Sequence, residues 1–401
     1  MEQALSDVKV LDLTWYIAGP YCTKMLADYG ADVVKVERPP EGDPARSIGP
    51  FLGDEPHPEK SGLFLHLNTN KRGITLNLKT DAGKSIFKEL VKNVDILVEN
   101  FSPGVMDRLG FSYEELEKIN PKLVVTSISN FGRTGPYRDF RATEIVEFAM
   151  GGEMYSTGSP ELTPLKLGGN VVQYQAGTIA AVSTMGALLW SRQQGVGQHI
   201  DISIMETQAG GADRRNIYLL GYAYGGVVTQ RWPSGGAAAV RSLLPRGIYP
   251  CQDGFVMFLG LPQWWPRFLK LLGLEGEPRF QNFIDTTHED EFRAIWFSWL
   301  VDHTKEEIFK LCLENRIAGA PLNTVEEVVN DRHLEYRGFF VEIEHPVVGR
   351  VKYPGAPFKM MESPWQAKRP APLLGQHNEE VYGQLGYTQK DLARLKEEGV
   401  I

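Results

Sequence analysis

The sequence predicts an α/β protein whose core is an open, doubly wound parallel sheet. Short runs rich in β-branched residues alternate with helical segments through residues 8–129. Helices of this length between strands allow the right-handed crossovers that connect parallel strands. The 401-residue chain, with 42% apolar and 23% charged residues, has the composition of a folded globular protein with room for two or three domains. Disordered, fibrous and small disulfide-stapled folds are therefore excluded.

The hydrophobic pattern places the individual elements of this sheet. It predicts strands at 8–13, 32–37, 74–78, 95–100, 123–129 and 199–205. It predicts helices over 20–30, opened by Pro20, and over 81–94, 113–120 and 176–192. The Gly-Val-Gly-Gln-His stretch at 195–199 follows a helix and precedes a strand, which is the reverse of a phosphate-binding loop. We therefore interpret it as a helix C-cap and turn.

Changes of composition along the chain suggest its domains. Residues 39–73 form a connection rich in proline and glycine, and loops of that length inside a compact domain are usually functional or disordered. Aromatic helical segments follow an irregular, glycine-rich stretch at 221–241. We expect an N-terminal part of a large α/β domain at 1–224, a smaller α/β domain at 225–328, and a return segment at 329–401.

Charge and cysteine content bear on partners and compartment. Lys and Arg number 42 against 50 Asp and Glu, so the net charge is −8, which disfavours nucleic acid as a partner. Cys22, Cys251 and Cys312 are scattered and odd in number, which favours a reducing compartment over a disulfide framework. No export signal, membrane-spanning stretch, zinc-binding histidine pattern or Gly-x-Ser-x-Gly motif is evident. We expect a cytoplasmic protein with no membrane contact and no metal.

Basic and polar side chains lie close to the predicted strand ends. The carboxyl ends of the strands form the ligand crevice of a doubly wound sheet, where Arg and Lys suit phosphate groups. The set consists of Arg38, Lys71, Arg72, Lys79, Asn100 and Arg108. Convergence on an anionic ligand and solvation as separate surface charges both remain open at this point.

Several long motifs, in a fixed order, carry a specific resemblance. They include VLDLTWYIAGPYCTKMLADYGADVVKVERPPEGDPAR (10–46), LNTNKRGITLNLKT (67–80), DILVENFSPGVMDRLGF (95–111), SRQQGVGQHIDISIMET (191–207), GAPLNTVEEVVNDRHLEYRGFFVEIEHPVVGRVKYPGAPF (319–358) and RPAPLLGQHNEEV (369–381). Together they resemble the class III CoA-transferase family, which includes formyl-CoA and carnitine CoA-transferases and α-methylacyl-CoA racemase. The resemblance covers nearly the whole chain and is weakest in the middle domain.

This resemblance implies a ligand, a set of binding residues and an assembly. Coenzyme A or its acyl thioester is implied as a substrate, with no permanently bound cofactor. The matching CoA-binding positions are Ile17, Ala18, Arg38, Leu76, Asn77, Lys79, Asn100, Phe101, Arg108, Arg141 and Thr143. The family fold implies an interlocked, ring-like dimer whose large domain is built from both ends of each chain.

One position departs from the family pattern in a way that matters for catalysis. Family members carry the acyl group on an Asp four residues before the glycine that opens the small-residue helix; here that glycine is Gly177 and the position is Gln173. A neutral carboxamide is a poor nucleophile and cannot form the acyl anhydride that CoA thiolate attacks next. Glu144 matches a supporting acid of the family, whereas Asp139 is expected in a solvated turn. Neither is expected to replace the nucleophile.

Three further features concern the racemase branch and the acyl pocket. Thr143 and Gln173 stand where the racemases have a His and Asp pair, and neither side chain can act as a base. The Ser-Gly-Gly-Ala-Ala-Ala-Val stretch at 234–240 replaces a glycine-rich loop and is expected to be stiffer. Trp15 and Tyr16 are expected beside the acyl pocket, either as ordinary packing or against an aromatic substrate.

These observations lead to one functional hypothesis and two alternatives. The hypothesis is a subunit of a heteromeric CoA-transferase that lacks the catalytic Asp and works with an Asp-bearing paralogous chain. Such an arrangement resembles family members that act on aromatic dicarboxylates such as benzylsuccinate, with succinyl-CoA as donor. The first alternative is a self-sufficient homodimeric acyl-CoA enzyme in which Gln173 or Glu144 supports other chemistry. The second is a non-enzymatic CoA-binding or scaffold protein.

Overall fold

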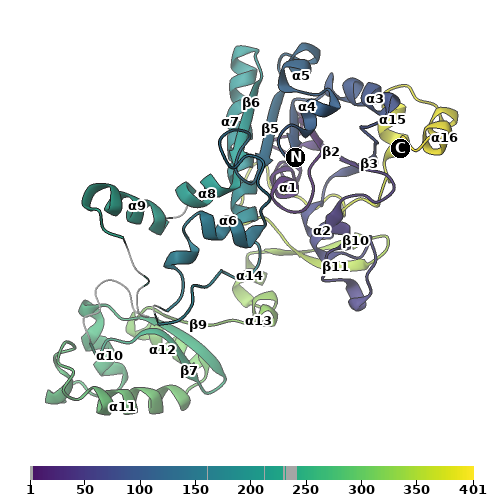
Figure 1. Cartoon of the computed structure of the whole chain (residues 1–401). Helices are drawn as coiled ribbons and strands as arrows, with labels where there is room; N and C mark the ends of the chain where they lie inside the picture. The colour runs from purple at the N-terminus through teal and green to yellow at the C-terminus, as the bar shows by residue number, and fades with distance from the viewer. Residues whose placement is uncertain (1–2, 160, 212, 229–230, 232–241) are drawn as a thin grey trace. The chain divides into compact units, whose positions relative to one another are not determined.

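A six-stranded parallel sheet forms the centre of the larger part of the chain (Figure 1). The computed structural model describes residues 3–159, 161–211, 213–228, 231 and 242–401. The strands are β1 (Lys9–Asp12), β2 (Asp32–Glu37), β3 (Arg72–Thr75), β4 (Ile96–Glu99), β5 (Val124–Ser129) and β6 (Gln198–Ser203). Their order is β3-β2-β1-β4-β5-β6, and all neighbouring strands are parallel. This order confirms the predicted doubly wound sheet and places its switch point between β1 and β4.

Helices cover both faces of the sheet because successive strand residues point to opposite sides. Val10 belongs to the core formed with α1 (Ala18–Asp28) and α7 (Val171–Gln194). Leu11 belongs to the opposite core, formed with α3 (Asp81–Val91) and α5 (Tyr113–Ile119). The remaining helices before residue 226 are α2 (Gly62–Leu67), α4 (Val105–Leu109), α6 (Glu144–Met150), α8 (Ile204–Gly211) and α9 (Asp213–Gly225).

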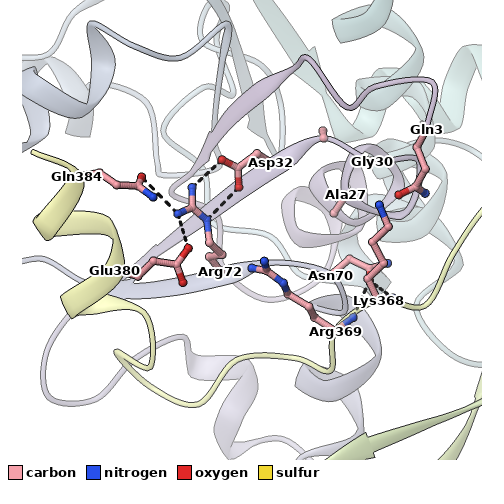
Figure 2. Close-up of a pocket in the computed structure, with 11 residues that line it drawn as sticks. Gln3, Ala27, Gly30, Asp32, Asn70, Arg72, Lys368, Arg369, Glu380 and Gln384 are labelled. Atoms are coloured by element: carbon pink, nitrogen blue, oxygen red, sulfur yellow. Dashed lines mark hydrogen bonds and ion pairs between the residues drawn. The ribbon is translucent and has the colours of Figure 1, made fainter. Parts of the chain in front are cut away.

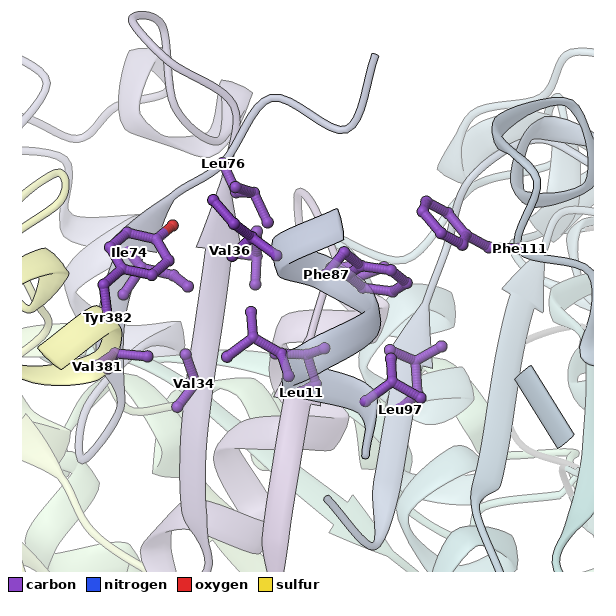
Figure 3. Packing of buried hydrophobic residues seen from close by; sticks show 14 of the residues in the cluster. Leu11, Val34, Val36, Ile74, Leu76, Phe87, Leu97, Phe111, Val381 and Tyr382 are labelled. Carbon is purple, nitrogen blue, oxygen red and sulfur yellow. The ribbon is translucent and has the colours of Figure 1, made fainter. Parts of the chain in front are cut away.

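The end of the chain packs onto the N-terminal strands. Helices α15 (Asn378–Gln384) and α16 (Gln389–Glu397) contribute Tyr382 and Leu395 to the core around Leu11. Figure 3 shows Tyr382 beside Ile74 in this core. The Tyr382 hydroxyl also donates a hydrogen bond to the Thr75 carbonyl (2.5 Å). Both ends of the chain therefore build one fold.

The chain divides into two compact units. The larger comprises Met1–Met154, Lys166–Val228 and Tyr336–Ile401, and it includes the antiparallel hairpin of β10 (Phe340–His345) and β11 (Gly349–Pro354). The smaller comprises Tyr155–Leu165 and Thr229–Glu335. Its antiparallel sheet has the order β7-β8-β9, formed by β7 (Arg246–Cys251), β8 (Gly254–Leu259) and β9 (Gly319–Pro321). Its helices include α10 (Trp265–Leu271), α11 (Glu289–Val301), α12 (Lys305–Asn315) and α13 (Val325–Val329), followed by α14 (Arg332–Tyr336) at the boundary.

Two of the differences between predicted and observed bounds affect the site. The strand expected at 74–78 ends at Thr75, because Asn77 N–H turns away to the Val400 carbonyl (2.7 Å) and Thr80 caps α3. The helix expected from residue 176 begins at Val171, so Gln173 lies in its first turn. The turn interpretation of 195–199 is confirmed, since Gly195 ends α7 in the left-handed region at a φ of 75°.

Buried ion pairs attach the long connection between β2 and β3 to residues of β1 and β2. The Arg46 guanidinium donates to both oxygens of Glu37 (2.7 and 2.8 Å), and Lys35 pairs with Asp43 (2.9 Å). Lys71 pairs with Asp12 (3.0 Å). All three pairs have side chains at most 1% exposed. Charges buried this deeply require their partners, so the pairs fix the path of residues 39–73.

Among the helices of the described residues, none combines the length and apolar character needed to cross a membrane.

Candidate active site

A cleft of about 450 Å³ opens at the carboxyl ends of β1 to β4, beside the switch point of the sheet. Its lining is mostly apolar, with a few polar and charged groups, which is typical of a small-molecule site. The lining residues are Leu13, Trp15, Tyr16, Val36, Glu37, Arg38, Leu76, Asn77, Leu78, Lys79, Asn100, Phe101, Ser102, Val105 and Leu109. The position agrees with the rule that open α/β sheets bind ligands at the switch point.

Asn100 joins the two strands that flank the switch point. Its Oδ1 accepts from Trp15 N–H (2.8 Å) and its Nδ2 donates to the Trp15 carbonyl (2.8 Å). The next residue, Tyr16, has a φ of 65°, and its N–H donates to Asp43 (3.1 Å). A positive φ costs energy in a tyrosine, so these hydrogen bonds help to maintain a strained turn. Asn100 thus fixes the backbone of Trp15 at the cleft, and both ends of its side-chain amide are used in these hydrogen bonds.

Two cations stand at the cleft. The half-exposed Arg38 guanidinium lies over the Trp15 ring, 5.9 Å from its centroid, and contacts Glu41 (3.2 Å). Lys79 follows β3 in a turn where its N–H donates to Asn77 Oδ1 (3.1 Å). A guanidinium and an ammonium at one mouth provide two separate contacts for phosphate groups.

The structure brings together six of the predicted CoA-binding positions and separates the others from the cleft lining. Arg38, Leu76, Asn77, Lys79, Asn100 and Phe101 line the cleft. Ile17 and Ala18 are buried just beyond it, at the start of α1, and Arg108 is exposed on α4. Arg141 and Thr143 are exposed on the segment leading into α6.

Of the two interpretations left open for the basic set, neither describes Lys71 and Arg72, which are absent from the cleft lining and are not solvated surface charges. They precede β3 or begin it, at the opposite end of the strand from the cleft. Lys71 is buried on Asp12. Figure 2 shows Arg72 held by Asp32 (2.6 Å) and Glu380 (2.9 Å) in a separate cavity of about 350 Å³. Both cations are therefore already neutralised by carboxylates of the fold.

Gln173 lies in the first turn of α7, which packs closely on α1. Gly177, one turn further, allows this approach, because a Cβ there would lie 2.5 Å from the Ala18 carbonyl oxygen. Tyr174 packs edge-on against Tyr21 of α1, with ring centroids 4.8 Å apart. Gly177 thus lies against Ala18, the first residue of α1, and residue 173 lies one turn before Gly177 on α7. The cleft residues Trp15 and Tyr16 shortly precede α1 in the chain.

Glu144 supports this turn by accepting backbone hydrogen bonds. Its two oxygens accept from Val172 N–H (3.1 Å) and Gln173 N–H (3.2 Å). Lys166 lies 3.7 Å from the same carboxylate. The side chain thus caps the N-terminus of α7 from the neighbouring helix, where a negative charge is favourable.

Sequence reasoning missed Glu147, which lies one turn after Glu144 on α6. Glu147 is completely buried, and its Oε2 accepts from Gln173 Nε2 (2.6 Å). With the Asn130 amide in the orientation that satisfies its neighbours, Asn130 also donates to Glu147 (2.9 Å). Burial raises the pKa of Glu147 to about 7, although the Gln173 hydrogen bond opposes this shift. The spacing of three residues from Glu144 was the available signal that both acids share one helix face.

Three other sequence expectations concern the acyl pocket and Asp139. Trp15 and Tyr16 line the cleft, and Tyr16 is about half exposed. Asp139 contacts Arg138 on an exposed turn, as expected for a solvated residue. The stretch 234–240 lies outside the described residues.

The fold and the cleft define a doubly wound α/β protein with a ligand site at the switch point. Residues 5–378 match the CoA-transferase family III, and the chain belongs to that family. It is 32% identical to succinyl-CoA–D-citramalate CoA-transferase of Chloroflexus aurantiacus over 99% of this chain and 98% of the relative. It is 31% identical to succinate–glutarate CoA-transferase of Agrobacterium fabrum over 95% of each chain.

A solved structure agrees with this assignment. A CAIB/BAIF family protein from Brucella suis matches with a TM-score of 0.82 and 27% identity, over 96% of this chain and all of that one. The family resemblance inferred from the sequence motifs is thereby confirmed.

Proposed function

We propose that this chain is a subunit of a class III CoA-transferase that lacks the acyl-carrying Asp and functions with a paralogous chain that has it. The observation that carries the proposal is that residue 173 is a glutamine whose side chain is hydrogen-bonded to Glu147. This side chain stands at the position that matches the acyl-carrying Asp of the family, here called the relay position, and it is a carboxamide. Its amide nitrogen donates a hydrogen bond to the buried Glu147. The cleft residues at the switch point remain available for coenzyme A.

The chemistry of the transfer explains why a carboxylate is needed. A carboxylate oxygen attacks the thioester carbonyl carbon, the C–S bond breaks, and CoA leaves as the thiolate. CoA thiolate then attacks the side-chain carboxyl carbon of this acyl anhydride, and the first acid leaves as a carboxylate. The second acid displaces CoA from the resulting enzyme thioester to form a new anhydride, and the thiolate attacks the new acyl carbon, which releases the product thioester and the enzyme carboxylate. Gln173 has no negative oxygen to begin this sequence. The Asp must therefore come from another chain.

The alternative nucleophiles near residue 173 are occupied. Both oxygens of Glu144 accept backbone hydrogen bonds from α7. Glu147 is completely buried, and its two oxygens accept from Gln173 and Asn130. A carboxylate without solvent exposure cannot meet an acyl-CoA carbonyl. These contacts favour the subunit over a self-sufficient homodimer.

Exposed apolar side chains support a protein partner for the larger unit. On α7 they are Val182, Leu189 and Trp190, and on α9 they are Leu219, Leu220, Tyr222 and Tyr224, which is 86% exposed. Apolar groups gathered on two helices are more typical of an interface than of a free surface. We propose that an interlocked dimer with the paralogous chain covers them.

For the acids we propose a dicarboxylate, with succinyl-CoA as donor and an aromatic acceptor such as benzylsuccinate. The relatives named above act on succinate, glutarate and D-citramalate, which all carry two carboxylates. Trp15 and Tyr16 at the cleft supply aromatic surface for a phenyl group. The three cysteines are buried free thiols, which favours the cytoplasm as the site of action.

Co-purification from the native organism tests the proposal. We expect a chain of similar size, with Asp at the position that matches Gln173, to accompany this protein in fixed stoichiometry. A protein that purifies only with copies of itself would contradict the heteromeric assembly.

Replacing Arg38 by Ala is expected to weaken CoA binding by about 10- to 150-fold, because a charge-assisted fork to phosphate contributes roughly 1.5–3 kcal/mol. Calorimetric titration of the assembled protein with CoA measures this change. Arg350→Ala serves as the matched control, since Arg350 is an exposed cation on the β10–β11 hairpin. Equal affinities of both variants would remove Arg38 from the site, and absence of binding to the unaltered protein would leave only the scaffold role.

A further inference from the structure

The first turn of α7 is joined to α6 by two acids with different tasks. Glu144 holds the backbone of the turn through Val172 and Gln173. Glu147 holds the Gln173 side chain through a hydrogen bond of 2.6 Å. The side chain at position 173 is therefore directed by Glu147, whereas its backbone is fixed independently.

Among the described residues, the surroundings of Glu147 provide hydrogen-bond donors but no cation in an ion pair with it. Asn130, after β5, donates to one oxygen, and Gln173 donates to the other. Within the described ranges, no Lys, Arg or His forms an ion pair with Glu147. The nearest ionisable group on its own helix is Glu144, which forms an ion pair with Lys166 (3.7 Å). From α8, which also packs on α6, Gln208 is neutral and donates to Gln175 (2.5 Å).

We infer that Glu147 is the positioning residue of side chain 173, and that the two positions form a coupled pair in which only one member is a carboxylate. In this chain Glu147 is the carboxylate and Gln173 is the neutral donor. This inference deepens the proposed function, because it concerns the same relay position. The coupling itself, however, requires neither CoA nor the partner chain.

A consequence follows for any repair of the missing nucleophile. In Gln173→Asp, a partly buried carboxyl group faces the completely buried carboxyl group of Glu147, and the two cannot both be ionised at small cost. One proton is then retained between them, and a hydrogen-bonded, half-protonated Asp is a weak nucleophile. Adding Glu147→Gln exchanges the roles of the two positions. The amide at position 147 then donates a hydrogen bond to the carboxylate at position 173. The shorter Asp and the packing of Trp15 and Tyr16 still limit the gain.

The test compares Gln173→Asp, Glu147→Gln and the double variant with the unaltered protein. Infrared titration follows the carboxylic acid C=O band, and mass spectrometry follows acyl adducts at residue 173 after addition of succinyl-CoA. If an Asp-bearing partner chain is present, its Asp is replaced first. Gln173→Asp combined with Glu117→Gln is the control, because Glu117 is exposed on α5 and its removal leaves the pair intact.

Gln173→Asp is expected to keep a protonated carboxyl band above pH 7, whereas the double variant loses this band at least one pH unit lower. At pH 6.5 the double variant is expected to form the acyl adduct at least tenfold faster than Gln173→Asp. Identical band titrations in Gln173→Asp and the double variant would overturn the coupling. A lowered titration without any adduct would support the coupling and contradict the view that the acyl pocket has remained functional.

Discussion

Purified without any related chain, the protein is expected to show no CoA-transferase turnover with any pair of acyl donor and acid. The side chain at the relay position is the carboxamide of Gln173, and its nitrogen donates a hydrogen bond to Glu147. Glu144, the other nearby acid, uses both oxygens to cap α7. Under the proposed function, we therefore expect no group at this place to form the acyl anhydride.

The measurement is a coupled assay with succinyl-CoA and a series of dicarboxylic acids. The preparation must be shown by mass spectrometry to contain this chain alone. Turnover at ~1 s⁻¹ or faster, an ordinary enzymatic rate, would contradict the expected result. Restoration of turnover on addition of an Asp-bearing paralogue provides the positive control.

The largest expected effect on stability comes from Lys71→Met, which should lower the free energy of unfolding by about 3–5 kcal/mol. The Lys71 ammonium is completely buried and donates to Asp12 (3.0 Å), the Pro20 carbonyl (2.9 Å) and Asn68 (2.9 Å). Burial alone would raise the pKa of Asp12, but Lys71, Lys35 and the hydrogen bonds from the Thr14 and Thr23 hydroxyls together lower the pKa to about 2. Removing Lys71 leaves this buried carboxylate without its closest counter-charge.

The direction in which the free energy of unfolding changes with pH follows from the pKa of Asp12. Because the folded-state pKa lies below the ordinary value of 3.8, Asp12 stabilises the fold above about pH 4 and loses this contribution as pH falls towards 2. In Lys71→Met this acid-sensitive contribution should shrink. Urea unfolding at pH 7 and pH 3 measures both effects, with Lys60→Met as control. Lys60 pairs with Glu55, which is 75% exposed, and should contribute less than about 1 kcal/mol.

The sequence was informative about the sheet because its strands are buried on both faces. Continuous apolar runs such as those around Leu11 and Val125 mark central parallel strands, and all six predicted strands are present. The end of β3 was not predictable, because it depends on a hydrogen bond from Asn77 to Val400, far along the chain. Contacts over such a separation leave no periodic signal.

The candidate site was predictable where it follows strand ends and unpredictable where it depends on pairing. Arg38, Lys79 and Asn100 follow β2, β3 and β4, and they line the cleft as the pattern predicted. Lys71 and Arg72 looked equivalent in sequence, but each is neutralised by a carboxylate within the fold. Glu147 was missed because an acid inside a short helix looks like surface charge until its burial is seen.

Acyl trapping in the assembly purified from its native source shows which of the two chains carries the acyl group. The complex is incubated with succinyl-CoA, quenched in acid, treated with or without hydroxylamine, and analysed by peptide mass spectrometry. We expect a hydroxylamine-sensitive succinyl group on an Asp of the paralogous chain and none on Gln173, Glu144 or Glu147 of this one. A succinyl group on a carboxylate of this chain would contradict this expectation.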